Sequence, residues 1–381
     1  MRALVALSLL ASAALTSATP GLAKPYSGSA PVAYLLDTFS DRALYERDAD
    51  KRIPTASMAK MMTAYVTFNA LKDKKVSRDQ KVKVSPATWR KWNNKGSTMF
   101  LRANESVSID NLLFGVLTLS GNDASVVLAE GVAESEEGFV AEMNAAAKKL
   151  GMANTHFANP NGWPDGGKTF STARDLATLA QAIVIEHPSA FERYFSRKSF
   201  RWSNVTQANR NPLLGVIDGA DGLKTGHSEA AGYCLAGTAK RGDRRLIMII
   251  AGLPTMQSRV AEARKFMNWG FSEWETESLF RKGQTVTQAP VQMGAVDSVP
   301  LVASWDFSAT KRAQSKEKLQ LKARYYGPIR APIRKGEALG ELIVRSADGK
   351  KQVLPLVAGK SVQQAGFLGR ALNGARALVR M

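Results

Sequence analysis

The stretch GLKTGHSEAAGYCLAGTAKRGDRRLIMIIA, residues 222–251, decides the fold class of this chain. It contains three short apolar runs, and Arg241-Gly242-Asp243 between the last two is typical of a hairpin turn. Segments with helical patterns lie on both sides of it, which indicates an α+β domain with helices flanking an antiparallel sheet rather than a doubly wound parallel sheet. The strands are expected over Gly222–Gly226, Gly232–Ala239 and Arg244–Ala251.

The segments before this sheet are mainly of helical type. Val32–Leu36 and Ala43–Tyr45 lie on either side of a turn and predict a strand hairpin. Residues 85–104 are polar and predict a loop that exposes Trp89 and Trp92. Helical periodicity with start and stop signals predicts the following helices: Ser57–Leu71, Ile109–Leu119, Ala124–Ala133, Glu136–Leu150, Thr172–Glu186 and Ser258–Asn268.

The composition excludes several classes of protein. The chain has 381 residues, of which 45% are hydrophobic and 22% charged, values that are ordinary for a globular protein and unlike a disordered or collagen-like chain. A mean hydropathy of −0.18 argues against several membrane spans. The single cysteine, Cys234, excludes an internal disulfide framework, and three scattered histidines (His156, His187, His227) argue against a metal enzyme. No metal or organic cofactor is expected.

The net charge of +19, from 52 Lys+Arg and 33 Asp+Glu, is consistent with binding to nucleic acid, with binding to an anionic membrane surface, or with neither. The N-terminus helps to decide between these explanations of the charge. Arg2 precedes an apolar run over Ala3–Leu15, and small residues follow at Gly21-Leu22-Ala23. This pattern is typical of a secretory signal peptide that is cleaved after Ala23, and the apolar run is too short for a membrane anchor. An exported protein does not normally meet nucleic acid, so no nucleic-acid partner is expected.

Two C-terminal segments carry most of the net charge. Residues 281–359 contain short alternating runs separated by Gly and Pro, with 14 Lys+Arg against 6 Asp+Glu, and predict a small all-β domain. Residues 360–381 add four cations and no acid. The expected organisation is a signal peptide over 1–23, an α+β domain over 24–280, a β-rich domain over 281–360 and an amphipathic helix over 361–381.

The last segment has a two-sided pattern when it is placed on a helical wheel. Its apolar side chains fall within an arc of about 140° and its arginines lie opposite: Phe367, Leu368, Ala371, Leu372, Ala375, Leu378 and Val379 against Arg370, Arg376 and Arg380. Such a helix is suited to lie in the plane of an anionic membrane surface. The alternative is a C-terminal helix that packs on the protein itself.

Three separated motifs contain residues suited to chemistry. In Ser57-Met58-Ala59-Lys60 the serine and the lysine are three residues apart, so they share one helix face. A lysine that is desolvated and close to a second cation can accept the serine proton. The second motif is Ser120-Gly121-Asn122, between two predicted helices, and the third is Lys224-Thr225-Gly226 on a predicted strand, before His227.

Each motif alone has an ordinary structural explanation, as a helix cap, a turn or a surface charge. All three in this order in an exported chain form the signature of penicillin-binding proteins and serine β-lactamases. The chain resembles the low-molecular-mass penicillin-binding proteins, which are serine D-alanyl-D-alanine carboxypeptidases, from about residue 28 onward. Further segments contribute to the resemblance: 54–65, 119–124, 159–162, 171–176 and 221–227. One departure is Ala59, where the family most often has Thr.

The resemblance implies a role for each motif residue. Ser57 would attack the carbonyl between two terminal D-alanines to give an acyl-enzyme, Lys60 would be the general base, and Ser120 would relay a proton to the leaving amine. The backbone N–H groups of Ser57 and His227 would form the oxyanion hole. The residues implied in substrate binding are Asn122, Lys224, Thr225, Gly226, His227, Arg259 and Arg210.

Other functions share part of this pattern. A class A β-lactamase uses a loop glutamate for deacylation, and residues 159–175 contain none. A D,D-endopeptidase that cuts peptidoglycan crosslinks, or an inactive peptidoglycan-binding scaffold, remains an alternative to the carboxypeptidase. The expected protein acts on peptidoglycan stem peptides, is acylated by β-lactam antibiotics, and lies peripherally at the periplasmic face of the cytoplasmic membrane.

Overall fold

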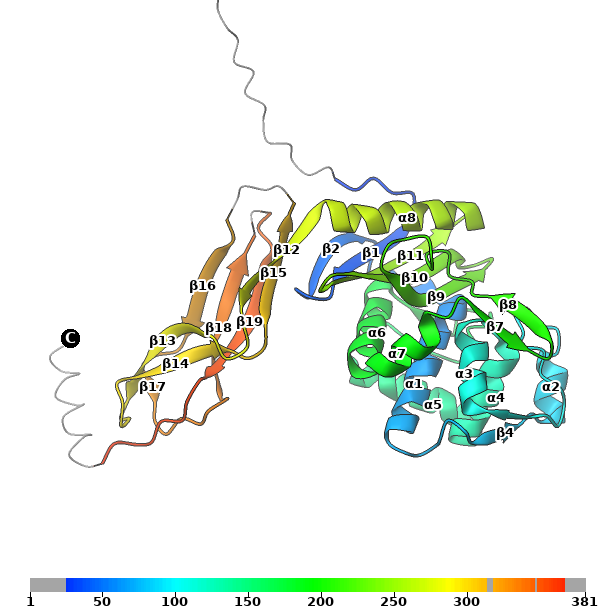
Figure 1. Ribbon diagram of the computed structural model, residues 1–381, viewed down its shortest axis with the longest axis horizontal. Coiled ribbons are helices and arrows are strands. Elements are labelled where there is room, and N and C mark those ends of the chain that lie inside the picture. The colour runs from blue at the N-terminus through cyan, green and yellow to red at the C-terminus, as the bar shows by residue number, and fades with distance from the viewer. Residues whose placement is uncertain (1–24, 314–317, 347, 367–381) are drawn as a thin grey trace, which may run out of the picture.

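The computed structural model describes residues 25–313, 318–346 and 348–366. Figure 1 shows two parts, a larger one in which helices cover a sheet and a smaller one made of strands. The predicted signal peptide, 1–23, lies outside the described residues, so it stays a prediction. None of the helices in the described ranges is both long and apolar enough to cross a membrane.

A five-stranded antiparallel sheet forms the centre of the larger part, in the order β2-β1-β11-β10-β9. The hairpin predicted from the Arg241-Gly242-Asp243 turn is present, with Leu235 opposite Ile250 and Thr238 opposite Ile247. The α+β class with an antiparallel sheet is therefore confirmed. The strands span Val32–Asp37 (β1), Arg42–Arg47 (β2), Ala220–Ser228 (β9), Gly232–Arg241 (β10) and Arg244–Leu253 (β11).

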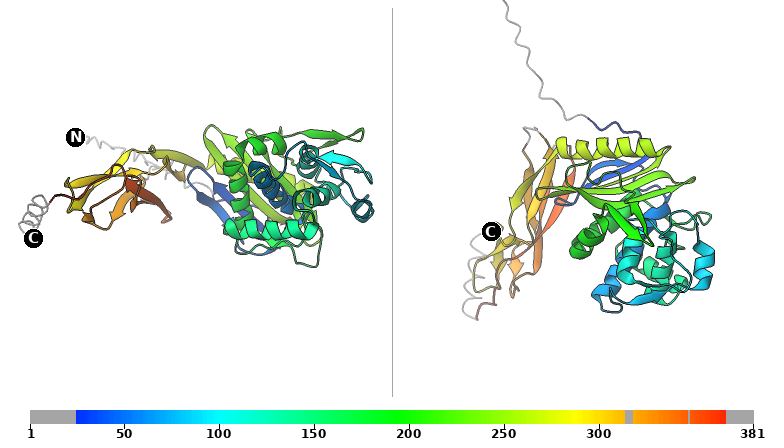
Figure 2. Two further views of the ribbon diagram at one scale, coloured as in Figure 1. Left: turned by 90° about the horizontal axis from the view of Figure 1, so that it is seen from below. Right: turned by 45° about the vertical axis from the view of Figure 1, so that its right-hand side comes forward.

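Helices cover both faces of this sheet, because its strands are apolar on both sides (Figures 1 and 2). Successive residues of a strand point to opposite faces, so Leu35 packs in the core under α8 while Leu36 packs in the larger core of the other face. The helices are α1 (Lys60–Lys72), α2 (Pro86–Trp92), α3 (Ile109–Leu117), α4 (Asn122–Ala133), α5 (Glu136–Lys149), α6 (Ala173–Glu186), α7 (Pro188–Phe195) and α8 (Met256–Ser272).

Side-chain caps explain where several helices begin. The hydroxyl of Ser108 accepts a hydrogen bond from the Asn111 N–H at the start of α3, and Thr255 forms a reciprocal capping box with Ser258 at the start of α8. Such caps contribute about 1 kcal/mol each. The helix predicted from Ser57 differs, since it opens with a 3₁₀ turn, η1 (Ala56–Ala59), before α1.

The structure corrects the prediction of a loop over residues 85–104. Pro86 lies at the first position of α2, where its missing N–H costs nothing, and the Ser85 hydroxyl caps the helix. Trp92, predicted to be exposed, is buried against Trp163, and Trp89 is half-buried. Helix α7 and several short strand pairs were not predicted: β3 (Ile53–Pro54) with β6 (Phe170–Ser171), β4 (Lys81–Lys83) with β5 (Ser106–Ser108), and β7 (Ser199–Trp202) with β8 (Val205–Ala208).

The smaller part is all-β. A six-stranded sheet has the order β16-β18-β19-β14-β13-β17, and its inward side chains, including Leu301, Leu342 and Leu356, form a separate core. Strand β12 (Trp274–Phe280) pairs with β15 (Phe307–Arg312), while the Trp274 ring packs in the core under α8. The other strands are β13 (Thr285–Gln292), β14 (Ser298–Ala303), β16 (Gln320–Tyr325), β17 (Ile329–Arg330), β18 (Ala338–Arg345) and β19 (Lys351–Ala358).

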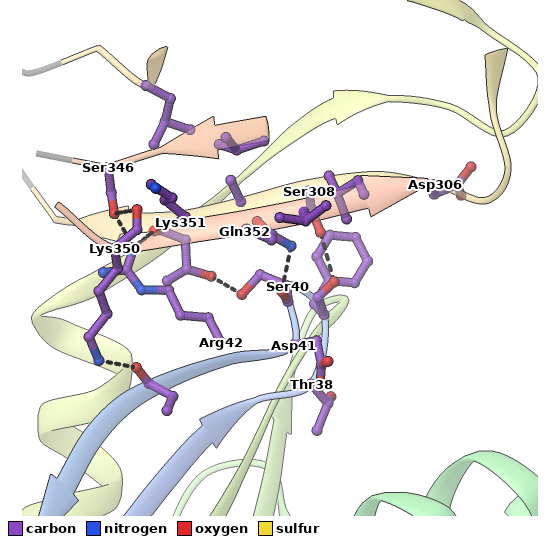
Figure 3. Close-up of a pocket in the computed structure, with 18 of the residues that line it drawn as sticks. Thr38, Ser40, Asp41, Arg42, Asp306, Ser308, Ser346, Lys350, Lys351 and Gln352 are labelled. Atoms are coloured by element: carbon purple, nitrogen blue, oxygen red, sulfur yellow. Dashed lines mark hydrogen bonds between the residues drawn. The ribbon is translucent and has the colours of Figure 1, made fainter. Parts of the chain in front are cut away.

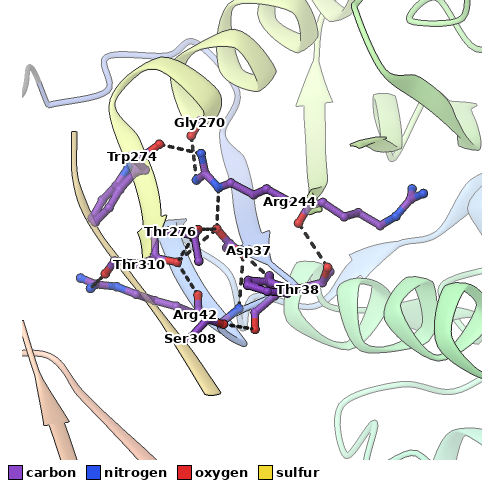
Figure 4. Close-up of polar contacts among 12 residues, drawn as sticks. Asp37, Thr38, Arg42, Arg244, Gly270, Trp274, Thr276, Ser308 and Thr310 are labelled. Carbon is purple, nitrogen blue, oxygen red and sulfur yellow. Dashed lines mark hydrogen bonds and ion pairs between the residues drawn. The ribbon is translucent and has the colours of Figure 1, made fainter. Parts of the chain in front are cut away.

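Polar contacts join the two parts. The fully buried Asp37 carboxylate accepts hydrogen bonds from Arg244 Nε at 2.7 Å and from Thr276 Oγ1 at 2.9 Å (Figure 4). Arg42 forms an ion pair with Asp348 across the joint. Beside these contacts, the β1–β2 turn and the β18–β19 hairpin line a hollow of about 530 Å³, which Figure 3 shows.

The described chain ends on the β-rich part, away from the helices (Figure 1). Val362 pairs with Ile333 and Gln364 pairs with Gly294 as isolated bridges, so residues 361–366 of the predicted 361–381 helix are extended. The remainder of that prediction, 367–381, lies outside the described residues.

Candidate active site

The side chain of Lys60 lies next to that of Ser57. Because Ser57 is in the 3₁₀ turn and Lys60 is the first residue of α1, both side chains point to one side of the chain. Lys60 is fully buried, and its Nζ is 3.0 Å from Ser57 Oγ, 2.8 Å from Asn122 Oδ1 and 2.6 Å from the Asn161 carbonyl oxygen. These three acceptors match the three donors of an ammonium group.

A second buried lysine perturbs the first. Lys224 on β9 is 2% exposed, and its Nζ donates a hydrogen bond to the Thr225 carbonyl oxygen. Burial lowers the pKa of Lys60 well below its ordinary value, and the charge of Lys224 lowers it further. Burial, together with Arg259 and Arg210, also lowers the pKa of Lys224, to about 7. Burial and the second cation therefore make the Lys60 ammonium release its proton more readily than an exposed lysine would.

The second motif lies where α3 ends and α4 begins. Ser120 has a φ of +62°, which lets the chain turn sharply between the two helices. Asn122 is the first residue of α4, and its Nδ2 donates to the Lys95 carbonyl oxygen while its Oδ1 accepts from Lys60. The buried Asp123 carboxylate accepts the backbone N–H groups of Met99 and Leu101, which holds the loop before α3 against this helix.

Two glycines allow the surrounding chain to approach the serine turn. Gly162 has a φ of +71°, and a Cβ there would lie 1.8 Å from the Ala56 carbonyl oxygen. A Cβ on Gly226 would lie 3.0 Å from the Thr55 carbonyl oxygen. Side chains at these positions would therefore push the Asn161 loop and strand β9 away from Ser57.

The third motif lines the free edge of the sheet. β9 is an edge strand, so its outer side is open to the cleft. Thr225 is buried, and His227 is exposed, with its ring stacked on Tyr233 at a centroid distance of 3.9 Å. The sequence left the side chain of His227 unassigned, and the structure places it on the wall of the cleft.

The two arginines differ in burial. Arg259 on α8 is 6% exposed, its guanidinium lies 5.6 Å from the centre of the Tyr233 ring, and its Nε has no hydrogen-bond partner among the described residues. Arg210 is exposed and donates to the Gln207 side chain at 3.2 Å. A buried guanidinium with an unused donor is suited to bind an anionic ligand group.

The structure brings all ten predicted site residues together. A cleft of about 630 Å³ is lined by eight of them, and Lys60 and Lys224 lie buried under its floor. The eight are Ser57, Ser120, Asn122, Arg210, Thr225, Gly226, His227 and Arg259.

Sequence reasoning missed several residues of the cleft. Asn161 lies in segment 159–162, which contributes to the resemblance, but no role is predicted for it from the sequence, although its carbonyl oxygen accepts a hydrogen bond from Lys60. Trp163, Glu229 and Tyr233 also line the cleft, and no motif pointed to them because each is brought there by the chain fold. No group of three metal-binding side chains occurs in the part of the chain that the structure describes.

Comparisons with known proteins agree with this geometry. The model of the D-alanyl-D-alanine carboxypeptidase family matches residues 19–255, and that of the penicillin-binding protein 5 C-terminal domain matches residues 274–364. The D-alanyl-D-alanine carboxypeptidase DacC of Escherichia coli is 36% identical over 344 residues, which are 88% of this chain and 85% of that protein.

Solved structures of penicillin-binding proteins are also similar to this chain. Penicillin-binding protein 5 from Haemophilus influenzae superposes with a TM-score of 0.84 at 32% identity, over 90% of this chain and 100% of that one. A Listeria monocytogenes penicillin-binding protein in its cefotaxime-bound form has a TM-score of 0.59 at 32% identity, over 65% of this chain and 99% of that one. The second match leaves about a third of this chain unmatched.

Proposed function

The chain belongs to the D-alanyl-D-alanine carboxypeptidase family, and on this premise we propose that its cleft removes the terminal D-alanine from peptidoglycan stem peptides through an acyl-enzyme on Ser57. One observation carries the proposal. The fully buried Lys60 amine, whose pKa is lowered by burial and by Lys224, lies 3.0 Å from the Ser57 hydroxyl oxygen. A serine with such a neighbour is an activated nucleophile.

Acylation follows from these contacts. Neutral Lys60 accepts the Ser57 proton while Oγ attacks the carbonyl carbon of the penultimate D-alanine. The oxygen of the tetrahedral intermediate is bound by the backbone N–H groups of Ser57 and His227, and an oxyanion-hole donor contributes about 3–4 kcal/mol. Ser120 relays the proton that Lys60 accepted to the amide nitrogen as the C–N bond breaks, so Lys60 becomes neutral again and D-alanine leaves as the free amino acid. Water then attacks the ester, with Lys60 again as the base.

The cationic end of the cleft selects substrates that end in a carboxylate. Thr225 supplies a hydroxyl, and Arg259 supplies a buried guanidinium with an unused donor. Arg210 lines the same end from the loop after β8. A free terminal carboxylate forms charge-assisted hydrogen bonds there, which an amidated or extended peptide lacks.

β-Lactam antibiotics fit the same site as covalent inhibitors. Their ring amide would take the place of the scissile bond and their carboxylate that of the terminal carboxylate, leaving an ester on Ser57. The cefotaxime-bound form of the Listeria monocytogenes relative supports this part of the proposal.

The location of the protein is a further part of the proposal. The leader pattern over residues 1–23 supports export to the periplasm, and the basic amphipathic pattern over residues 367–381 supports peripheral attachment to an anionic membrane surface. The described chain ends on the β-rich part, which would then lie between the membrane and the catalytic cleft (Figure 2).

The experiment that tests the function uses two substrates. The protein is incubated with a pentapeptide stem and, separately, with a crosslinked stem dimer, and free D-alanine and dimer cleavage are followed by chromatography. D-alanine release from the first without cleavage of the second supports the carboxypeptidase. Cleavage of the dimer alone would indicate the endopeptidase, and no turnover of either would indicate a scaffold. Ser57→Ala is the control that must abolish turnover.

A further inference from the structure

The hollow of about 530 Å³ at the joint between the two parts has two exposed aromatic side chains on its wall. Phe39 belongs to the β1–β2 turn of the larger part and is 40% exposed. Trp305 belongs to the turn between β14 and β15 of the smaller part and is 50% exposed. Aromatic side chains usually bury most of their surface. Two exposed rings that line one concave site therefore point to a ligand, and the reaction proposed above does not use them.

Both aromatic residues are held in place by contacts within the protein. The Phe39 backbone N–H donates to Asp37 Oδ1 at 3.0 Å, and the Phe39 carbonyl oxygen accepts from Ser308 Oγ at 2.8 Å. The Trp305 ring makes an edge-on contact with the buried Phe307, with centroids 5.6 Å apart. A ligand that binds here pays little entropy to order these residues, because the site is formed before binding.

The charges around the hollow are balanced, although the whole chain carries +19. Among the described residues that line it, three are acidic and three are basic: Asp41, Glu46 and Asp306 against Arg42, Lys350 and Lys351. An anionic ligand would therefore gain little here from the excess of cations elsewhere in the chain. A neutral ligand with many hydroxyl groups fits better, because it can both donate to the acids and accept from the cations.

Gln352 adds an amide with a fixed orientation. Its side chain lines the hollow, and its Nε2 donates across the joint to the Ser40 carbonyl oxygen, as Figure 3 shows. Because the amide group is planar, this bond also fixes the position of Oε1, which can accept a hydrogen bond from a ligand. The N–H of an acetamido group is a donor suited to that oxygen.

We propose that this hollow binds a glycan built of N-acetylated amino sugars. The face of an aromatic ring is partially negative and attracts the C–H groups on one side of a pyranose ring, so Phe39 and Trp305 each pack against a sugar. Gln352 accepts from an acetamido N–H. The stem peptides of peptidoglycan are carried on strands of such sugars, so the hollow gives the protein a second contact with the same polymer. The inference goes beyond the carboxypeptidase reaction, because binding here needs no chemistry at Ser57.

The hollow is separate from the catalytic cleft. Strands β1 and β2, whose turn lines the hollow, lie at the edge of the sheet opposite β9, which lines the cleft. Three to four strand spacings separate these edges by roughly 15–20 Å. A glycan contact at this distance acts on polymeric peptidoglycan and leaves turnover of a short soluble peptide unchanged.

The experiment titrates the full chain with the hexamer of N-acetylglucosamine in a calorimeter. The proteins compared are the unmodified chain, Phe39→Ala, Trp305→Ala and Trp305→Phe. Tyr326→Ala is the matched control, because Tyr326 is an exposed aromatic residue of the same β-rich part that does not line the hollow. Maltohexaose, which has no acetamido groups, is the comparison ligand. D-Alanine release from a soluble pentapeptide is measured on the same preparations.

Each alanine variant of Phe39 and Trp305 should raise the Kd by about 3- to 10-fold, as expected for the loss of one aromatic contact. Trp305→Phe should raise it less, and Tyr326→Ala should leave it unchanged. Since the ligand is uncharged, 0.5 M salt should change the Kd by less than about twofold.

Three results would overturn the proposal: no binding by the unmodified protein at about 5 mM ligand, equal binding of maltohexaose, or an unchanged Kd in both alanine variants. Binding of the hexamer without release of D-alanine from the pentapeptide would refute the carboxypeptidase function and support the glycan site.

Discussion

Lys60 Nζ lies 3.0 Å from Ser57 Oγ, and the lysine side chain is fully buried between the Ser57 turn, Asn122 and Asn161. A lysine with no solvent contact and a second buried cation nearby binds its proton weakly. In the structure this nitrogen donates to Ser57 Oγ, so loss of its proton would leave a base within hydrogen-bond distance of the serine hydroxyl.

Replacement of Lys60 by arginine should nearly abolish acylation while preserving a positive charge. A guanidinium is not deprotonated in proteins, so it cannot accept the Ser57 proton. The second-order rate constant for acylation by a labelled penicillin should fall by roughly 10²- to 10⁴-fold. It can be measured by intact-protein mass spectrometry over time. An acylation rate close to that of the unmodified enzyme would remove Lys60 from the role of base.

The pH profile of kcat/KM should have two limbs. Activity rises with pH as Lys60, whose pKa is depressed, becomes neutral. It falls above about pH 7 as Lys224, with a pKa of about 7, loses its charge. Lys224→Arg should move the second limb to higher pH, because the guanidinium stays charged. If the limb stays where it was in this variant, Lys224 is not its source.

Lys224→Met should make the protein more stable although less active. The pKa of Lys224 is about 7 in the folded state against 10.5 as its ordinary value, so folding with the charged lysine is penalised. The gain in free energy of unfolding is expected to be about 1–3 kcal/mol below pH 7 and to shrink as the pH rises from 7 toward 10.5. Urea unfolding at pH 6 and pH 9 measures it. If Lys224→Met increased the free energy of unfolding more at pH 9 than at pH 6, the prediction would be wrong.

Arg259→Gln should weaken recognition of the terminal carboxylate. The buried guanidinium has a donor without a partner, and loss of a charge-assisted contact there should lower kcat/KM by roughly 10- to 100-fold. The exposed Arg210, replaced in the same way, should have a smaller effect. A peptide that ends in D-alaninamide is the control substrate, because its turnover should change little in either variant. Equal losses on both substrates would indicate a structural role instead.

Asp37→Asn should loosen the joint between the two parts without reducing acylation of Ser57. The carboxylate is fully buried and accepts from Arg244 and Thr276, so loss of its charge is expected to cost roughly 3 kcal/mol of stability. Denaturant unfolding measures this loss, and a labelled penicillin reports the active site. Asp218→Asn, which changes a largely exposed ion pair at 3.5 Å, should have less than about 0.5 kcal/mol of effect. Equal effects of the two variants would contradict the importance of the buried pair.

The sequence by itself determined the elements that depend on local patterns. The three runs of residues 222–251 form β9, β10 and β11, because strand alternation and hairpin turns are set by neighbouring residues. The residue types of the three motifs, with Ser57 and Lys60 three apart on one face, also identified the family. By contrast, α2 and α7 were missed, since short helices that begin with proline depend on caps and packing that a polar or mixed composition does not show.

Only the tertiary structure decided what surrounds the serine. Burial of Lys60 and Lys224 depends on segments about 60 to 165 residues away along the chain, which converge at one point. The same convergence brings the Asn161 carbonyl oxygen to Lys60 and leaves Glu229 as the only acid among the described residues that line the cleft. Spacing in sequence can show that two residues share a helix face. Desolvation, the proximity of distant charges and the shape of a cleft arise only when the chain is packed, and these set the proton affinity of the site.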